Sequence, residues 1–351
     1  MKKQYYSVDL IKIICALLIV CIHTSPLSSL SGRLNSLLVN CICRIAVPFF
    51  FIASGFFLFS KSGVETSETG VIKAYLKRML FLYLFWSAVY FPFTALNMAY
   101  PPIGETALSV FLNWLKNMVF SAGFGFLWYL PASIAAVSAV TVMLKCGIKI
   151  NRIIFIGFIL YCIGLCGQSY FGLVKAIPFP QGFLKAVSSV YSFIGTTRNG
   201  VFEGIVFIAL GAELSQRAAD GSLGSFKRNI FGFAVSSVLL AAEFVFVGKM
   251  KWHLEYDMYL FLIPAAYFLL RSALSFNEPP SFAGLRLLRP YSSLIYFTHM
   301  LPIELYCIFT RLSYTNSVAM FFIALIPTLL LSSLIIYVSG KRRFEFLKKI
   351  Y

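Results

Sequence analysis

The sequence predicts an all-α polytopic membrane helix bundle with about ten transmembrane helices, both termini cytoplasmic, and short interfacial helices. Of its 351 residues, 59% are hydrophobic and only 12% are charged, and the mean hydropathy is +0.83. A soluble domain of this length could not bury so much apolar surface, so the lipid bilayer must serve as part of its solvent. No soluble domain or long linker is visible, and we expect residues 1–351 to form a single integral membrane domain.

Apolar stretches of spanning length follow one another along the whole chain, and each approaches the ~20 residues that cross ~30 Å of hydrocarbon. The ten predicted spans are Leu10–Leu27, Leu37–Phe59, Met79–Met98, Phe124–Leu144, Ile153–Phe171, Gly200–Leu214, Ile230–Val247, Tyr256–Leu270, Tyr291–Phe309 and Ser317–Val338. Two further stretches, Thr106–Phe120 and Phe183–Ile194, carry Lys116 and Lys185 among apolar residues at helical spacing. This pattern predicts helices that lie on the membrane surface.

The basic residues orient these spans. A net charge of +17 is also found in nucleic-acid-binding proteins, but basic residues beside apolar spans are topology signals first, and we expect no nucleic-acid partner. With the N-terminus inside, 20 of the 30 Lys and Arg residues fall in inner segments and 8 in outer segments. This bias fits the positive-inside rule with both termini in the cytoplasm. We expect a multi-pass protein of the cell membrane.

The sequence predicts neither a cleaved leader nor a metal site. The first span lacks a small-x-small cleavage site, and Asp9 and Lys12 interrupt its start, so we expect a permanent helix. Most of the eight cysteines lie in spans, and their closest pairs lack the His or Cys partners of a zinc site. We therefore expect buried free thiols and no metal.

Ionisable residues inside the spans are the candidates for chemistry, because such residues are costly in lipid and usually face the bundle interior. At ~100° per residue, Asp9, Lys12 and His23 share one stripe of the first helix. This stripe places charge near the cytoplasm and an imidazole ~16 Å further out. A structural histidine bonded to a backbone carbonyl is the alternative interpretation of His23.

Most of the other candidates lie in the middle or outer half of the spans, and Arg198 and Asn199 directly precede the sixth span on its outer side. Arg44 has the guanidinium geometry that suits a carboxylate or phosphate, or it forms an ion pair with a buried glutamate. The remaining candidates for substrate binding are Trp128, Tyr129, Arg198, Asn199, Glu203, His299 and Glu304. On the inner side, Lys73, Lys77 and Arg78 form a basic cluster at the base of the third span. This cluster either binds an anion or only fixes the topology.

Five short segments are distributed in order along nearly the whole sequence. They are residues 8–12 followed by Ala16, Val20 and His23; residues 44–56 (RIAVPFFFIASGF); Lys77 and Arg78 followed by residues 83–86 (YLFW); residues 126–130 (FLWYL); and residues 292–299 (SSLIYFTH). Together they resemble the membrane acyltransferase 3 family, which comprises ten-helix integral membrane O-acyltransferases that act on surface sugars and similar acceptors. By this resemblance, His23 corresponds to the essential histidine of the family, and Arg78 to the basic end of its cytoplasmic arginine motif.

The sequence departs from the family pattern at two positions. Lys12 stands where the family usually has arginine, and Tyr75 replaces the upstream arginine of the Arg-x-x-Arg motif.

Residues 197–200 (TRNG) and 207–211 (FIALG) resemble one branch of the family, the membrane region of serine racemases associated with vancomycin resistance. In that branch the membrane region precedes a cytoplasmic racemase domain and is suspected of handling serine. Because the present chain ends at Tyr351, we expect no racemase domain.

The resemblance implies transfer of an acyl group, most simply acetyl, from cytoplasmic acyl-CoA to a hydroxyl of an extracytoplasmic glycan or small acceptor. His23 would act as general base or form an acyl-histidine, while Lys73, Lys77, Arg78 and Lys12 would hold the phosphates of CoA. A different hypothesis is a module that binds or transports a small solute such as serine, with Arg44 on its carboxylate and a glutamate on its amine. A third is a family member that has lost catalysis and serves as an anchor or sensor.

Overall fold

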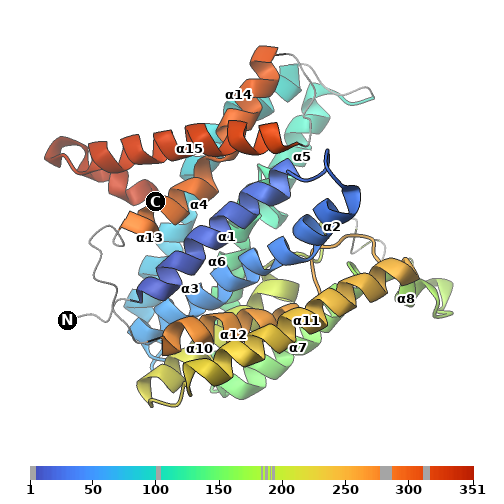
Figure 1. The fold of residues 1–351 in the computed structure, drawn as a ribbon, viewed down its shortest axis with the longest axis vertical. Coiled ribbons are helices and arrows are strands. Elements are labelled where there is room, and N and C mark those ends of the chain that lie inside the picture. Colours follow the sequence, from blue (N-terminus) through green and yellow to red (C-terminus); the bar gives the residue numbers. More distant parts are fainter. Residues whose placement is uncertain are drawn as a thin grey trace. The chain divides into compact units, whose positions relative to one another are not determined.

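A computed structural model describes residues 5–99, 104–182, 185, 189, 191, 194–276, 287–310 and 317–351 (Figure 1). These residues are mainly helical, and they contain no strand. Among them, seven helical segments are long and apolar enough to cross a membrane, and two shorter apolar helices accompany them. The protein is therefore an all-α, multi-pass membrane helix bundle.

Each of the ten predicted spans coincides with helical structure. The helices that correspond to them are α1 (Tyr6–Thr24); α2 (Gly32–Asn40), η1 (Ile42–Ile45) and α3 (Ala46–Ser62); α4 (Thr69–Ala99); η2 (Gly125–Trp128) and α6 (Tyr129–Lys145); α7 (Ile150–Cys166); η3 (Gly200–Gly204) and α10 (Ile205–Ala219); α11 (Phe226–Met250); α12 (Leu262–Ser275); α13 (Leu288–Thr298) and α14 (Met300–Thr310); and α15 (Val318–Ser339). The described chain also has α8 (Phe171–Lys175) and the C-terminal 3-10 helix η5 (Arg342–Ile350).

The sixth, eighth and ninth spans show the clearest differences from the sequence prediction. The ninth is divided at His299, because Pro302 has no N–H to donate to the carbonyl of Thr298. The sixth begins with a π-helical turn, η3. The eighth begins at Leu262 rather than at Tyr256, and the carboxylate of Glu243 accepts the backbone N–H of Phe261 at 2.9 Å just before it. A carboxylate at this position stabilises the positive end of the helix dipole.

The surface stretch predicted at Thr106–Phe120 is helix α5 (Ala107–Phe120), which begins with a capping box between Thr106 and Ser109. Most of the second such stretch, Phe183–Ile194, lies outside the described residues.

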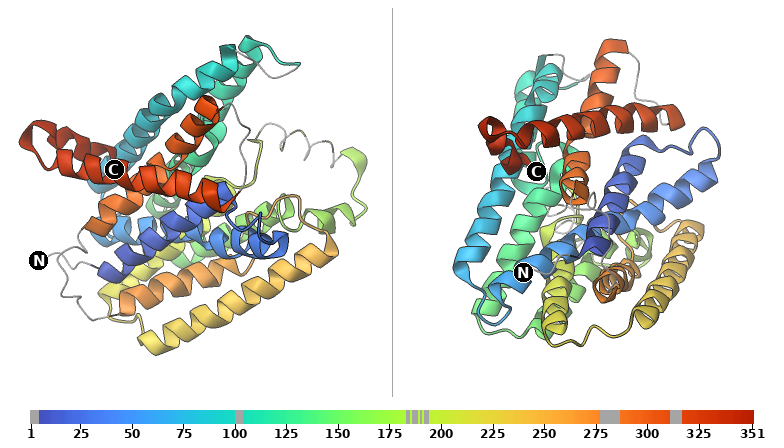
Figure 2. Two further views of the ribbon diagram at one scale, coloured as in Figure 1. Left: turned by 45° about the horizontal axis from the view of Figure 1, so that its top comes forward. Right: turned by 60° about the vertical axis from the view of Figure 1, so that its left-hand side comes forward.

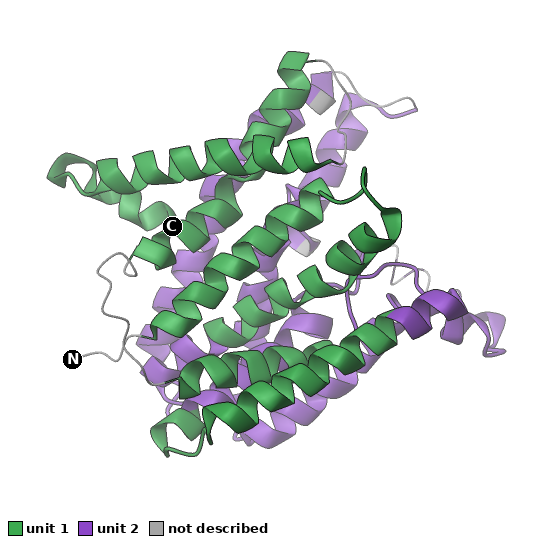
Figure 3. Ribbon diagram, in the orientation of Figure 1, with its two compact units in different colours: residues 1–54, 216–244, 261–351 green, residues 55–215, 245–260 purple. Residues whose placement is uncertain are grey.

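The chain forms two compact units, which Figure 3 distinguishes by colour. The first comprises residues 1–54, 216–244 and 261–351. In it, α1 packs against α13, and also against α12 and α15 (Figure 2). The core between these helices contains Ala16, Val20, Ile295, Ile303, Met320 and Ala324. The N–H of Ser317 donates to the carbonyl of Thr24 at 3.2 Å, so α15 starts where α1 ends.

The second unit comprises residues 55–215 and 245–260. In it, α6 packs against α4, and η3 lies between α6 and α7. Gly200 lets η3 approach the backbone of α6 at Ala132, and Gly55 lets α3 approach the backbone of α10 at Ile208. Small residues at such crossings are typical of membrane helices, which gain stability from close backbone packing.

Candidate functional site

A cavity of about 450 Å³ in the first unit brings together two of the predicted site residues, His23 and Glu304. His23 comes from the last turn of α1, and Glu304 from the second turn of α14. The complete lining is Ile22, His23, Ser25, Met300, Ile303, Glu304 and Cys307. Both polar side chains are half-buried, so they belong to the protein interior yet face open space. The cavity therefore combines an imidazole and a carboxylate with apolar walls, as small-ligand sites commonly do.

The ring of His299 packs against the imidazole of His23. The two rings are 5.2 Å apart between centroids and tilted by 39°. His299 is fully buried, and its Nδ1 lies 3.0 Å from the carbonyl oxygen of Ile295 and 2.9 Å from that of Tyr296. Because carbonyl oxygens only accept, Nδ1 must carry the proton, and the neutral ring then has its lone pair on Nε2. The break between α13 and α14 thus fixes both the position and the tautomer of this ring.

Charges also gather in the first turns of α1 and α13, about three turns before His23 along α1. Asp9 interacts electrostatically with Lys12 of its own helix and with Arg289 of α13. Asp9 is buried and Lys12 is half-buried. The predicted stripe on α1 is therefore occupied at both ends, by charges at the start and by the His23 cavity at the end.

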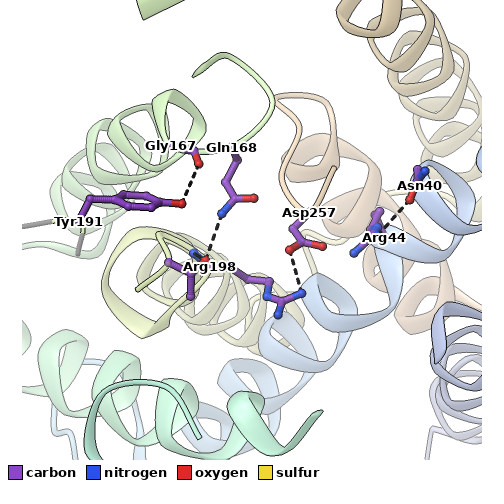
Figure 4. Close-up of polar contacts among 8 residues, drawn as sticks. Asn40, Arg44, Gly167, Gln168, Tyr191, Arg198 and Asp257 are labelled. Carbon is purple, nitrogen blue, oxygen red and sulfur yellow. Dashed lines mark hydrogen bonds and ion pairs between the residues drawn. The ribbon is translucent and has the colours of Figure 1, made fainter. Parts of the chain in front are cut away.

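Arg44 lies in η1, and its guanidinium donates to the side-chain oxygen of Asn40 one turn earlier, at 3.2 Å (Figure 4). It is half-buried and is not among the residues that line the His23 cavity. Its role in substrate binding stays a prediction.

A second polar cluster, in the second unit, contains Trp128 and Arg198. The guanidinium of Arg198 forms an ion pair with Asp257 at 2.8 Å (Figure 4). It also lies over the ring of Trp128, 4.9 Å from the ring centroid. Asp257 was missed in the sequence because residues 256–270 were interpreted as one span, which hides a carboxylate at the start of an apolar run. Burial raises the pKa of the nearby Tyr191, and the negative charges of Glu255 and Asp257 raise it further.

Asn199 has a structural role at the start of η3. Its side-chain oxygen accepts the N–H groups of Val201 and Phe202, and its amide group donates to the carbonyl of Thr196 at 3.0 Å. These bonds cap the π-helical turn that contains Glu203, which is 1% exposed. The other predicted residue of this unit, Tyr129, is half-buried at the start of α6.

The predicted basic cluster lies on the first three turns of α4. Lys73, Lys77 and Arg78 are all exposed. Tyr75 instead contacts α6, where its hydroxyl shares a hydrogen bond of 2.8 Å with the buried Ser133. Tyr75, which stands at the position of the family's first arginine, thus connects α4 to α6. The basic charges of this region are those of Lys73, Lys77 and Arg78.

Comparison with known proteins now gives the family. Residues 5–337 match the acyltransferase domain that defines the acyltransferase 3 family. The chain belongs to this family. The resemblance found in the sequence is therefore confirmed over nearly the whole chain, and no solved structure matches it.

Curated relatives of this family member have names that refer to racemases. An "Amino-acid racemase" of Enterococcus faecalis is 31% identical over 276 residues, which cover 78% of this chain and 36% of the relative. A second protein of that name from the same species is 30% identical over 273 residues, covering 77% and 37%. A "Serine/alanine racemase" of Enterococcus gallinarum is 28% identical over 268 residues, covering 75% and 36%. The chain spans little more than a third of the length of these relatives.

Proposed function

We propose that this protein is an O-acyltransferase of the bacterial cytoplasmic membrane. It transfers an acyl group, most simply acetyl, from cytoplasmic acyl-CoA to a hydroxyl of an extracytoplasmic glycan or other acceptor. The observation that carries the proposal is the cavity that joins His23 to Glu304, with the ring of His299 against His23, in a member of an acyltransferase family.

His23 is the proposed general base. It takes the proton of the acceptor hydroxyl, whose oxygen attacks the thioester carbonyl. The C–S bond then breaks, and the imidazolium returns the proton to the departing thiolate, which gives an O-acyl ester and free CoA. Glu304, in the same cavity, stabilises the imidazolium, and His299 orients the His23 ring. An acyl-histidine intermediate uses the same residues in two steps.

The phosphates of CoA are assigned to Lys73, Lys77 and Arg78. All three are exposed at the start of α4, which the charge pattern places on the cytoplasmic side. Lysines bind phosphate as point charges, and Arg78 adds a planar fork of donors. Tyr75 does not contribute, since its hydroxyl is bonded to Ser133.

The double substitution Lys73→Ala/Lys77→Ala is expected to raise the KM for acetyl-CoA about tenfold or more and to leave kcat nearly unchanged. Two lost phosphate contacts weaken ground and transition states equally, and a tenfold loss of affinity corresponds to ~1.4 kcal/mol. The measurement is CoA release in membranes at varied acetyl-CoA. The control is Lys149→Ala, another exposed lysine of an inner segment. An unchanged KM would mean that the cluster only fixes the topology.

The function itself is tested with acetyl-labelled acetyl-CoA given to the cytoplasmic face of inverted membrane vesicles. Vesicles that contain the protein are expected to transfer label into a non-thioester product, and vesicles without it are not. Release of the label by mild alkali would identify an O-acyl ester.

The relatives' names support a second candidate, binding or transport of a small amino acid such as serine. In that case labelled serine would bind in the same vesicles without acyl-CoA, and Arg44→Ala would abolish the binding. Acyl transfer is favoured because Arg44 donates to Asn40 and does not line the cavity that contains Glu304.

A further inference from the structure

A second cavity, of about 340 Å³, lies in the second unit between α4, α5 and the start of η2. It shares no lining residue with the cavity of His23 and contains none of the residues proposed for catalysis. Its lining includes Thr94 of α4, Glu105, and Asn113, Trp114 and Asn117 of α5.

Helix α5 has one exposed apolar face and one face that lines this cavity. At ~100° per residue, Leu108, Leu112, Leu115 and Val119 fall on one side, and all four are exposed. Asn113, Trp114 and Asn117 fall on the opposite side and line the cavity. A helix with one exposed apolar face and one polar face is typical of the membrane interface. The cavity therefore opens on the polar side of an interfacial helix.

The position of the cavity along α4 indicates at which face of the membrane the cavity lies. Thr94 lies 21 residues after Lys73 on the same helix, which corresponds to ~30 Å of helix, the thickness of the hydrocarbon. The basic cluster is at the cytoplasmic end by the charge pattern, so the cavity is at the outer end of α4.

The side chains in the cavity fit a neutral, hydroxyl-rich ligand. Trp114 offers an aromatic face, and its ring is held by Phe111 and Phe91 at centroid distances of 6.2 and 5.3 Å. Asn113 and Asn117, one turn apart, each provide an amide donor and acceptor, and Glu105 adds a carboxylate acceptor. Within the described residues, no Lys or Arg lines this cavity, which argues against phosphate or an anionic headgroup.

We infer that this cavity is a saccharide-binding site on the outer face, which captures the glycan acceptor by stacking a sugar ring on Trp114 and bonding its hydroxyls to Asn113, Asn117 and Glu105. The assignment as acceptor site rests on the proposed acyl transfer; the binding of saccharide does not.

The test uses the full chain in lipid nanodiscs, because maltoside detergents would themselves compete for the site. Titration with the tetramer of N-acetylglucosamine and with maltotetraose is expected to show saturable binding of at least one of them. Asn113→Ala and Trp114→Ala are each expected to raise the Kd at least tenfold, and Trp114→Phe less. Asn151→Ala, the same change at an exposed position of α7, serves as the control and is expected to leave the Kd unchanged.

The His23→Ala protein separates the two proposals. It should bind the saccharide with unchanged affinity while acyl transfer is lost, so that either proposal can fail without the other. Absence of binding by both saccharides would overturn the inference. A Kd for saccharide that neither Asn113→Ala nor Trp114→Ala changes would also overturn it. So would saturable binding at this cavity of the cation choline and of neither saccharide.

Discussion

The substitution His23→Ala is expected to lower acyl transfer by about 10²- to 10⁴-fold, the range that a positioned general base contributes. At ~1.4 kcal/mol per tenfold change, this corresponds to ~3–5 kcal/mol of transition-state stabilisation. His23 lines the cavity with Glu304 and contacts the ring of His299, so its loss removes the proton acceptor and leaves the cavity walls in place. The measurement is transfer of labelled acetyl by membrane vesicles, normalised to the amount of folded protein.

The chain provides a matched control, because it has only three histidines. His253 is half-buried in the second unit, where its ring stacks on Tyr256 at 4.0 Å between centroids. His253→Ala removes an imidazole of comparable exposure without touching the cavity and should retain transfer. The loss in His23→Ala should appear in kcat rather than in the KM for acetyl-CoA, since the proposed donor contacts are made elsewhere. Full activity of His23→Ala would exclude this residue as base or nucleophile.

The spans could be predicted from the sequence because apolar length is a strong and local signal. All ten coincide with helices, including the weak one at Gly200–Leu214, where Glu203 and Glu213 interrupt the apolar pattern. Helix ends were less accurate. The eighth helix starts six residues later than predicted, because apolar composition does not show that Glu243 and Phe261 mark its beginning.

The site could be predicted only in part, because its residues meet through tertiary packing. The depth of His23, His299 and Glu304 in their spans was readable, but their meeting depends on how α1 lies against α13 and α14. The partners of Arg198 and Tyr75, which are Asp257 and Ser133, come from segments 59 and 58 residues away in the chain. No local pattern indicates such pairs. Asn199 illustrates the opposite case, since a polar residue directly before a helical run is a capping signal.

The substitution Gly200→Ala is expected to destabilise the second unit by about 1–3 kcal/mol or more, the cost of inserting a group into a closely packed contact. A methyl group at this position would collide with the carbonyl oxygen of Ala132 and lie 2.9 Å from the Cβ of Ala135. Both belong to α6, and a backbone oxygen cannot move aside as a flexible side chain can. The collision pushes η3 away from α6 and disturbs the turn that carries Glu203. We expect a melting midpoint lower by about 5 °C, or loss of the monodisperse protein.

Gly32→Ala is the appropriate comparison, since a methyl group at Gly32 meets nothing within 4 Å. Gly32 is exposed at the first position of α2, after the cap residue Ser31, and its φ does not require glycine. Alanine there restricts the unfolded chain and favours the helix, so the midpoint should stay unchanged or rise, by up to ~1 kcal/mol in stability. Equal midpoints for Gly200→Ala and Gly32→Ala would show that α6 and η3 are not in close backbone contact. In that case the packing of η3 against α6 would also fail, because Gly200 is what permits η3 to approach this helix.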